Sequence, residues 1–160
     1  MTSQKITIGL VVVALFVGSM TAHADDFDVG FEAHQRGDFA TALRIFRQLA
    51  EQGDASAQYN LAFMYDNGRG VTQDYAEAMK WFRIAADQGH VRAQTGVSLI
   101  YDLGRGVTQD YVQAHMWYNI AAAQGQKDAG KWRDSLAEKM TPEQIAEAQK
   151  LARYWKPRGK

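Results

Sequence analysis

The sequence predicts an all-α protein built from repeated pairs of helices, and three observations support this prediction. The octapeptide GRGVTQDY occurs twice, at 68–75 and at 104–111, so the two copies lie 36 residues apart. Apolar residues flank both copies at spacings of three and four, the period of a helix with one buried face. Glycine and aspartate recur at the same interval, where one helix would end and the next begin. Self-similarity at a fixed interval indicates a repeat array.

The first helix of the best-defined unit is predicted over residues 54–67. Its apolar residues recur at helical spacing and form one stripe: Ala57, Leu61, Met64 and Tyr65. Gly68 then ends the helix, because glycine enters the left-handed cap conformation at little cost. The connector RGVTQ follows. A phosphate-binding loop is the alternative for this stretch, but the Lys-Ser/Thr of a P-loop is missing and no strand precedes it.

The second helix begins at Asp74, and its counterpart one repeat later begins at Asp110. Aspartate is a favoured N-cap, and Glu77 and Gln113 stand three residues on, at capping-box spacing. The predicted buried face combines small alanines with large rings: Ala78, Trp81, Phe82, Ala85 and Ala86. The alanines allow neighbouring helices to approach closely, while the tryptophan fills the wider gap beside them. Gly89 ends this helix.

The N-terminal residues carry a different kind of sequence. Lys5, the apolar stretch 6–20 and the motif Ala22-His23-Ala24 match a bacterial secretory signal peptide that is cleaved after Ala24. The alternative is an uncleaved anchor, although an apolar stretch of about 15 residues is short for a membrane-spanning helix. The predicted domains are the signal peptide 1–24 and a repeat domain 25–160, with repeats at about 27–53, 54–89 and 90–125 and a C-terminal cap at 126–156.

The two ends of the array depart from the central pattern, as array ends tend to do. At the N-terminal end, a helix pair over 27–35 and 38–52 is joined only by Arg-Gly. Near the C-terminus a helix over 128–139 is followed by T-P-E-Q, which marks a helix start through an N-cap, a proline at the first position and a capping box. The final helix, roughly 142–155, is predicted to cover the last exposed stripe. The basic tail beyond it (Lys156, Arg158 and Lys160) is predicted to be solvated, and contact with anionic envelope polymers is the alternative.

One long pattern identifies a family resemblance. It reads A-Q-x-x-L-x-x-M-Y-x-x-G-x-G-V-x-x-D-Y-x-x-A-x-x-W-F-x-x-A-A-x-x-G over 57–89, and a close second copy covers 93–125. The pattern resembles the Sel-one-like repeat (SLR), a relative of the tetratricopeptide repeat (TPR). The resemblance implies an α/α superhelical solenoid of antiparallel helix pairs, right-handed and used mostly as an interaction scaffold. The first pair, with its short turn, is closer to a TPR unit.

The residues offer little support for catalysis, and we predict neither an enzyme nor a cofactor. The chain has no cysteine, which excludes a disulfide framework and thiol catalysis, and its net charge of zero argues against a nucleic-acid binder. No two histidines stand four apart, so no metal site is predicted from the candidates His34, His90 and His115. No nucleophile motif surrounds Ser56, Ser98 or Ser135. Some cysteine-rich SLR proteins are linked to β-lactams, and their cysteine pairs are absent here.

A partner-binding row is predicted where the two copies disagree, because positions kept for folding should match between repeats. On the first helix of each unit, the differing positions fall on the side away from the apolar stripe. These residues are Tyr59, Phe63, Thr95, Leu99 and Leu103. First helices line the concave face of superhelical arrays, so this row is a candidate ligand groove. The alternative is that Phe63 and Leu99 pack between adjacent first helices.

The predicted function is therefore a non-catalytic, exported scaffold in the bacterial envelope that binds a protein or peptide of unknown identity. The expected location is the periplasm or the outside of the cell. The alternative is an envelope enzyme or binder acting on peptidoglycan or β-lactam-like ligands. That alternative would need convergent polar groups in a pocket, such as Ser98 beside a base.

Overall fold

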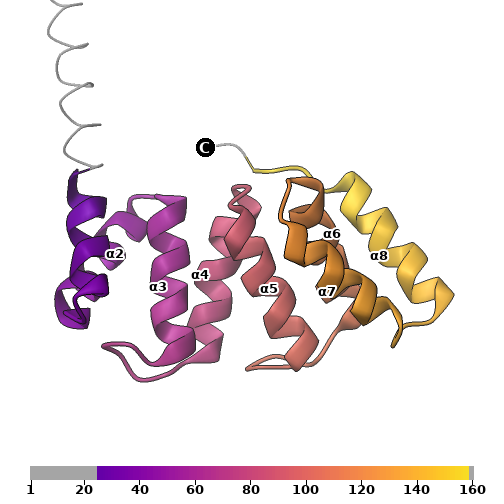
Figure 1. Ribbon diagram of the computed structural model, residues 1–160, viewed down its shortest axis with the longest axis horizontal. Coiled ribbons are helices and arrows are strands. Elements are labelled where there is room, and N and C mark those ends of the chain that lie inside the picture. Colours follow the sequence, from indigo (N-terminus) through magenta and orange to yellow (C-terminus); the bar gives the residue numbers. More distant parts are fainter. Residues whose placement is uncertain (1–24, 159–160) are drawn as a thin grey trace, which may run out of the picture.

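A computed structural model of the chain describes residues 25–158, and all of its regular elements are helices (Figure 1). The predicted signal peptide at 1–24 lies outside the described residues. A helix over residues 25–35 is followed by seven more: α2 (Phe39–Glu51), α3 (Ala55–Asn67), α4 (Tyr75–Asp87), α5 (Val91–Leu103), α6 (Tyr111–Ala123), α7 (Lys127–Ala137) and α8 (Pro142–Tyr154). The all-α class and the repeat of helix pairs predicted from the sequence are confirmed.

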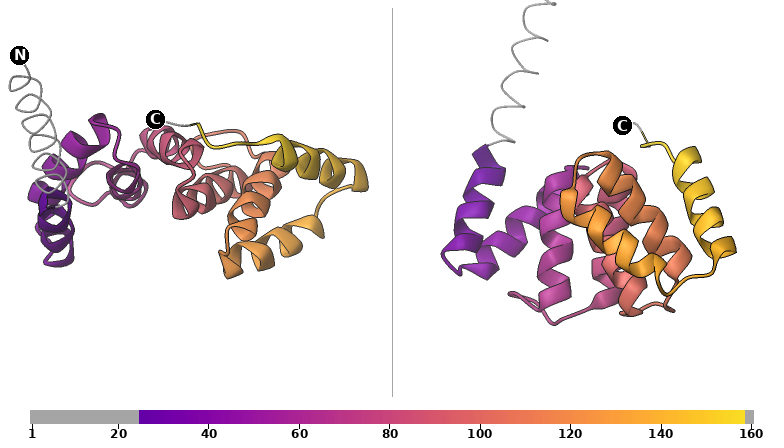
Figure 2. Two further views of the ribbon diagram at one scale, coloured as in Figure 1. Left: turned by 90° about the horizontal axis from the view of Figure 1, so that it is seen from above. Right: turned by 45° about the vertical axis from the view of Figure 1, so that its right-hand side comes forward.

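The helices stand in two rows along a curved array. From α2 to α7 each helix packs against the next one in the chain, whereas α8 packs against α6. Seen from above, the 25–35 helix, α3, α5 and α7 lie along the inner side of the curve, and α2, α4, α6 and α8 along the outer side (Figure 2, left). We call the first set the inner row. The helices of the inner row therefore form the concave side of the molecule.

The two copies of GRGVTQDY adopt the same backbone conformation. Gly68 and Gly104 end α3 and α5 in the left-handed region, with φ of 64° and 63°. The N-cap aspartates that start α4 and α6 also match, with φ of −146° and −143°. In each copy the glutamine of the connector donates to a carbonyl of the preceding helix, Gln73 to Asp66 and Gln109 to Asp102, at 2.7 and 2.6 Å. The octapeptide is one turn used twice.

The second glycine of the octapeptide is required by the preceding unit. A Cβ added at Gly70 would stand 2.6 Å from the Cβ of Phe39, and one at Gly106 would stand 2.7 Å from the Cβ of Tyr75. Both glycines also have positive φ, 71° and 66°. Each connector thus lies directly on the first turn of the preceding outer-row helix, and a side chain at either position would push the two units apart.

The predicted capping boxes form only in part. The Asp74 carboxylate accepts from the Ala76 and Glu77 N–H groups, but the Glu77 carboxylate turns to Lys80 instead of to the Asp74 N–H. The Asp74 N–H donates to the Tyr65 carbonyl at 3.0 Å, and the Asp110 N–H donates to the Tyr101 carbonyl at 3.1 Å. Neither N–H is therefore left for the side chain three residues on. At α8 both halves form, because the Thr141 hydroxyl accepts from the Gln144 N–H and the Gln144 side chain accepts from the Thr141 N–H.

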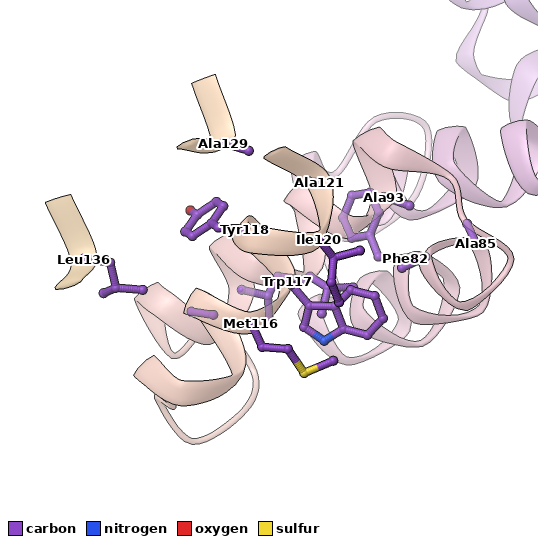
Figure 3. Packing of buried hydrophobic residues seen from close by; sticks show 14 of the residues in the cluster. Phe82, Ala85, Ala93, Met116, Trp117, Tyr118, Ile120, Ala121, Ala129 and Leu136 are labelled. Atoms are coloured by element: carbon purple, nitrogen blue, oxygen red, sulfur yellow. The ribbon is translucent and has the colours of Figure 1, made fainter. Parts of the chain in front are cut away.

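The core is divided between two clusters, one at the N-terminal end and a larger one that runs from α3 to α8. Trp117 is fully buried in the larger cluster, and Trp155 of α8 covers it edge-on with ring centroids 5.7 Å apart. The predicted apolar face of α8 packs against this cluster through Ile145, Ala148, Leu151, Ala152 and Trp155. Figure 3 shows Trp117 and Tyr118 leaving opposite sides of α6, with Leu136 and Ala129 of α7 on the Tyr118 side.

Two buried glutamines at the same repeat position, Gln58 and Gln94, each carry a hydrogen-bond relay. Gln58 Nε2 donates to the Ala50 carbonyl at 3.1 Å, and its Oε1 accepts from Gln88 Nε2 at 2.7 Å. One repeat later, Gln94 and Gln124 make the same contacts at 3.4 and 2.9 Å, with Ala86 as the carbonyl. Each relay ties one inner-row helix to the C-terminal ends of two outer-row helices.

Residues 157 and 158 of the C-terminal tail contact α4, while the side chains of Lys156 and Arg158 remain exposed to solvent, as predicted. Lys160 lies outside the described residues. The Arg158 N–H donates to the Asp87 carbonyl at 2.7 Å, and Pro157 lies against Gly89. The Arg158 guanidinium also stands 3.9 Å from the Asp87 carboxylate. Because Asp87 ends α4, the basic tail returns across α6 to the preceding unit.

Candidate partner-binding site

The predicted partner-binding row lies on two inner-row helices, and its members differ in exposure. Tyr59 and Phe63 on α3 are half-buried and pack against the larger core cluster. Leu99 and Leu103 on α5 are exposed, at 40% and 48% of their surface. Thr95 is half-buried, and its hydroxyl donates to the Val91 carbonyl. The predicted row therefore has a half-buried part on α3, formed by Tyr59 and Phe63, and an exposed part on α5, formed by Leu99 and Leu103. We call the part on α5 the open half of the row.

Two residues from other segments lie against the Phe63 ring. The Arg69 guanidinium of the connector lies 5.2 Å from the centre of its ring, and the His34 ring stands edge-on at 6.3 Å. Phe63 therefore fills space between the 25–35 helix and the connector, as the packing alternative describes. Leu99, at the equivalent position one repeat later, has no such cover and faces a hollow.

The α5–α7 hollow is the cavity beside Leu99. It has a volume of about 200 Å³ and is lined by Thr95, Leu99, Asp102, Tyr118, Trp132, Ser135, Leu136 and Lys139. Leu103 lies outside its lining. Sequence reasoning found Thr95 and Leu99 and missed the other six residues, because those six come from α6, from α7 and the turn after it, and from a position shared by both copies. Their proximity depends on how α7 packs.

The hollow lies at the junction where one repeat position changes from glycine to tryptophan. At the α4–α5 junction the Phe82 ring lies against Gly96, where an added Cβ would be 2.9 Å away. One repeat later the equivalent residues are Tyr118 and Trp132, and their rings stand 5.9 Å apart at a tilt of 50°. The contact of a ring with a glycine at the α4–α5 junction is thus replaced at the α6–α7 junction by a contact between two rings, and both rings line the hollow. Trp132 remains 46% exposed on the wall of that space.

Two charged residues, Asp102 and Lys139, line the α5–α7 hollow, and their contacts differ. Burial, with the nearby Asp102 charge, raises the pKa of the Tyr118 hydroxyl far above its usual range, so this group is a neutral donor at physiological pH. The Lys139 ammonium lies 6.0 Å from the centre of the Tyr111 ring, a cation–π contact. Within residues 25–158, the Asp102 carboxylate forms neither an ion pair nor a hydrogen bond.

A second cavity, the N-terminal hollow, lies between the 25–35 helix and the starts of α3 and α5. Its volume is about 450 Å³, and it is lined by Phe27, Asp28, Phe31, Ser56, Tyr59, Asn60, His90, Val91 and Arg92. The Tyr59 ring stacks on the His90 ring at 5.0 Å. His90 is also the N-cap of α5, because its Nδ1 accepts from the Ala93 N–H at 3.2 Å. Burial and the neighbouring Arg92 lower the pKa of His90, which keeps Nδ1 free to accept.

The polar residues considered for catalysis do not converge. His34 stands against the Phe39 ring, His90 caps α5 and His115 is buried in α6. Ser98 is fully buried and its hydroxyl donates to the Gln94 carbonyl at 2.8 Å, so it does not face either hollow. Within residues 25–158, no three His, Asp or Glu side chains are grouped as metal ligands would be. Every helix in this range is too short or too polar to span a bilayer.

Comparison with known proteins places these features in a family. The Sel1 repeat matches this chain at residues 27–54, 55–90 and 91–126. A crystal structure of a protective antigen of uropathogenic Escherichia coli strains, which displays an SLR fold, aligns with a TM-score of 0.80 and 30% identity over 83% of this chain and 29% of that one. A Sel1 repeat protein from Oxalobacter formigenes aligns with a TM-score of 0.62 and 29% identity over 76% of this chain and 56% of that one.

A curated relative matches over a shorter stretch. It is an exopolysaccharide production negative regulator from Rhizobium leguminosarum bv. viciae, 42% identical over 50 residues, which is 31% of this chain and 19% of that protein. This chain therefore spans less than two thirds of the length of each of these three proteins. Sel1 repeats generally mediate contacts between proteins and typically act as non-catalytic scaffolds.

Proposed function

Because the chain belongs to the Sel1 repeat family, we propose that it is an exported, non-catalytic scaffold that binds a segment of a partner protein along its inner row. The observation that carries the proposal is the exposed apolar surface on α5 and α7. Leu99, Leu103 and Trp132 are large exposed apolar residues on the inner-row helices α5 and α7, and a cavity is lined by Leu99 and Trp132. Contiguous apolar surface of this kind marks interaction sites in soluble proteins.

Two further features support parts of the proposal. The N-terminal sequence, with its basic start, apolar stretch and Ala22-His23-Ala24 motif, supports export. The regulator from Rhizobium supports only the idea that such repeats occur in a protein that acts by regulation. The partner in this proposal is a protein or peptide of the envelope or the extracellular space.

Site-specific photo-crosslinking tests the binding surface in the producing cell. A benzoylphenylalanine placed at Leu99 should crosslink one discrete protein. Ile84 on α4 is the matched control, because it is also an apolar residue and is exposed to 39%, against 40% for Leu99, but it lies on the outer row outside both hollows. Equal crosslinking from both positions, or none from Leu99, would contradict the proposed surface.

Export has its own test, which is independent of binding. Mass spectrometry of the protein recovered from the periplasmic fraction and from the medium should give a chain that begins at Asp25. Recovery of the full-length chain from the membrane fraction would favour the uncleaved anchor. Recovery from the cytoplasm alone would contradict export.

A further inference from the structure

We infer that the α5–α7 hollow receives an arginine side chain of the partner, with its guanidinium at Asp102 and its stem against Leu99 and Trp132. This inference rests on the proposed function and makes it more specific, because it names the residue type that the exposed surface on α5 and α7 recognises. Its basis is the size of the hollow, the apolar character of its walls and the state of its two charges.

The size of the hollow fits one long side chain. Its volume of about 200 Å³ is below the roughly 300–1,000 Å³ of cavities that hold drug-sized molecules. Leu99, Leu136 and the Trp132 ring supply apolar walls, and Tyr118 closes the back. A bound group must therefore be mostly apolar along its length and narrow enough to enter from the concave face.

The charges in the hollow favour a cationic end group. The Lys139 ammonium is held over the Tyr111 ring, whereas Asp102 has no ion-pair or hydrogen-bond partner within residues 25–158. A purely apolar ligand would cover the Asp102 carboxylate and leave it without a hydrogen bond, which is costly. A ligand that ends in a donor with positive charge compensates that loss of hydration.

Arginine meets these conditions better than lysine. Its guanidinium is planar, less strongly hydrated than an ammonium, and able to donate two parallel hydrogen bonds to one carboxylate. The same plane stacks on an aromatic face, and the half-exposed Trp132 ring offers that face beside Asp102. The three methylene groups of arginine then lie against Leu99 and Leu136.

A random dodecapeptide library displayed on phage supplies the probe, since it presupposes no partner. Panning against the purified full chain should enrich peptides that share an arginine next to an apolar residue. A synthetic enriched peptide, fluorescently labelled, should bind about tenfold more weakly when norleucine replaces this arginine, and by a smaller factor when lysine does. The Asp102→Asn variant should lose about the same tenfold for the arginine peptide and nothing for the norleucine peptide.

The variants and controls follow from the repeat. Asp66 occupies the position equivalent to Asp102 one repeat earlier and lies outside the hollow, so Asp66→Asn should leave peptide affinity unchanged. Asp102→Lys should reverse the preference and enrich peptides with glutamate at the arginine position. Circular dichroism melting of each variant checks that the fold is retained, and Trp132→Ala provides a second way to weaken the arginine peptide without touching Asp102.

The outcomes separate this inference from the proposed function. Enrichment of peptides without a basic residue, or equal losses for both peptides in Asp102→Asn, would overturn the arginine site and leave the binding surface standing. Enrichment no greater for the native protein than for a folded Leu99→Asp/Leu103→Asp variant would overturn both. An arginine preference that depends on Asp102 and not on Asp66 supports the inference.

Discussion

The α3–α4 unit and the α5–α6 unit are joined by the same turns and yet present different surfaces. Both end their first helix at a left-handed glycine, begin their second at an aspartate cap and bury one glutamine relay. They differ where they meet their neighbours. Phe82 of the first unit closes over Gly96, whereas Tyr118 of the second meets Trp132 and leaves a cavity.

This difference shows where a repeat protein is free to acquire a site. The shared residues contact backbone groups, so a change in one of them breaks a turn that every unit needs. The residues that differ lie at the contacts between helices, so a change there alters how neighbouring helices pack and leaves the turns intact. A binding cavity therefore arises at a junction between units, and the regular part of each unit stays constant.

The largest expected effect is on the free energy of unfolding, and it differs between Trp117 and Trp81, which occupy the same position in two repeats. Trp117 is fully buried under α8, so Trp117→Ala should lower the free energy of unfolding by about 3–5 kcal/mol. Trp81, the equivalent residue one repeat earlier, is half-buried, and Trp81→Ala should cost roughly half as much. Urea unfolding of both variants, followed by circular dichroism, measures the difference. Equal losses would show that the α8 cap adds nothing to the second unit.

Two substitutions that change side-chain size, one at each junction, test the role of the residues at this position. Gly96→Ala forces a Cβ to within 2.9 Å of the Phe82 ring and should destabilise the protein by about 1–3 kcal/mol. Trp132→Ala removes a half-exposed ring and should change the stability by less than about 1 kcal/mol. Thermal melts of the two variants give the comparison. A larger loss for Trp132→Ala would mean that this ring supports α7 rather than lining an open hollow.

The sequence predicted the repeat units and their turns because each depends on residues close together in the chain. Gly68 and Asp74 act on their own helices, and no tertiary contact is needed to read them. The partner row was predicted by helical periodicity alone, which places Phe63 and Leu99 alike. Periodicity does not show that Arg69 and His34 contact Phe63, since the first contact depends on how the connector folds back and the second on how the 25–35 helix packs against α3.

Helical periodicity could not predict the hollow either, because the hollow depends on contacts between residues far apart in the chain. Trp132 and Tyr118 lie outside the predicted row, and their meeting depends on the distance between α6 and α7. One feature of the sequence would have pointed to it: at the position of Gly96, the next repeat has a tryptophan. The backbone contact of Arg158 with Asp87 was not predicted either, because it joins residues 71 positions apart.

A smaller effect is expected from the glutamine relays. Gln58→Ala leaves the Ala50 carbonyl and the Gln88 amide without their partner and should cost about 1–2 kcal/mol. Gln94→Ala should cost less, because the bond from Gln94 to the Ala86 carbonyl is longer, 3.4 Å against 3.1 Å. Urea unfolding of the two single variants measures this order. The reverse order would show that the relay is stronger in the second unit.

The smallest expected effect distinguishes the caps of α3 and α5, where Asp54 and His90 occupy the same position. Burial lowers the pKa of His90, so below about pH 6.5 the unfolded chain takes up a proton that the folded chain does not. Stability contributed by His90 is therefore present at pH 7 and is lost as the pH falls below about 6.5. Protonation of Nδ1 would also end its hydrogen bond with the Ala93 N–H.

The variant His90→Asp tests this difference, because it gives α5 the cap that α3 already has. Between pH 7 and pH 5 the native protein should lose more free energy of unfolding than the variant does, by up to about 1 kcal/mol, the usual contribution of an N-cap. His34 and His115 also have pKa values lowered by burial, but they titrate in both proteins and cancel in the comparison. The same loss in both proteins would show that protonation of His90 does not contribute to the pH dependence of stability. A pH-dependent melt of the His90→Asn variant decides the point, since asparagine caps the helix without titrating and without an aromatic ring.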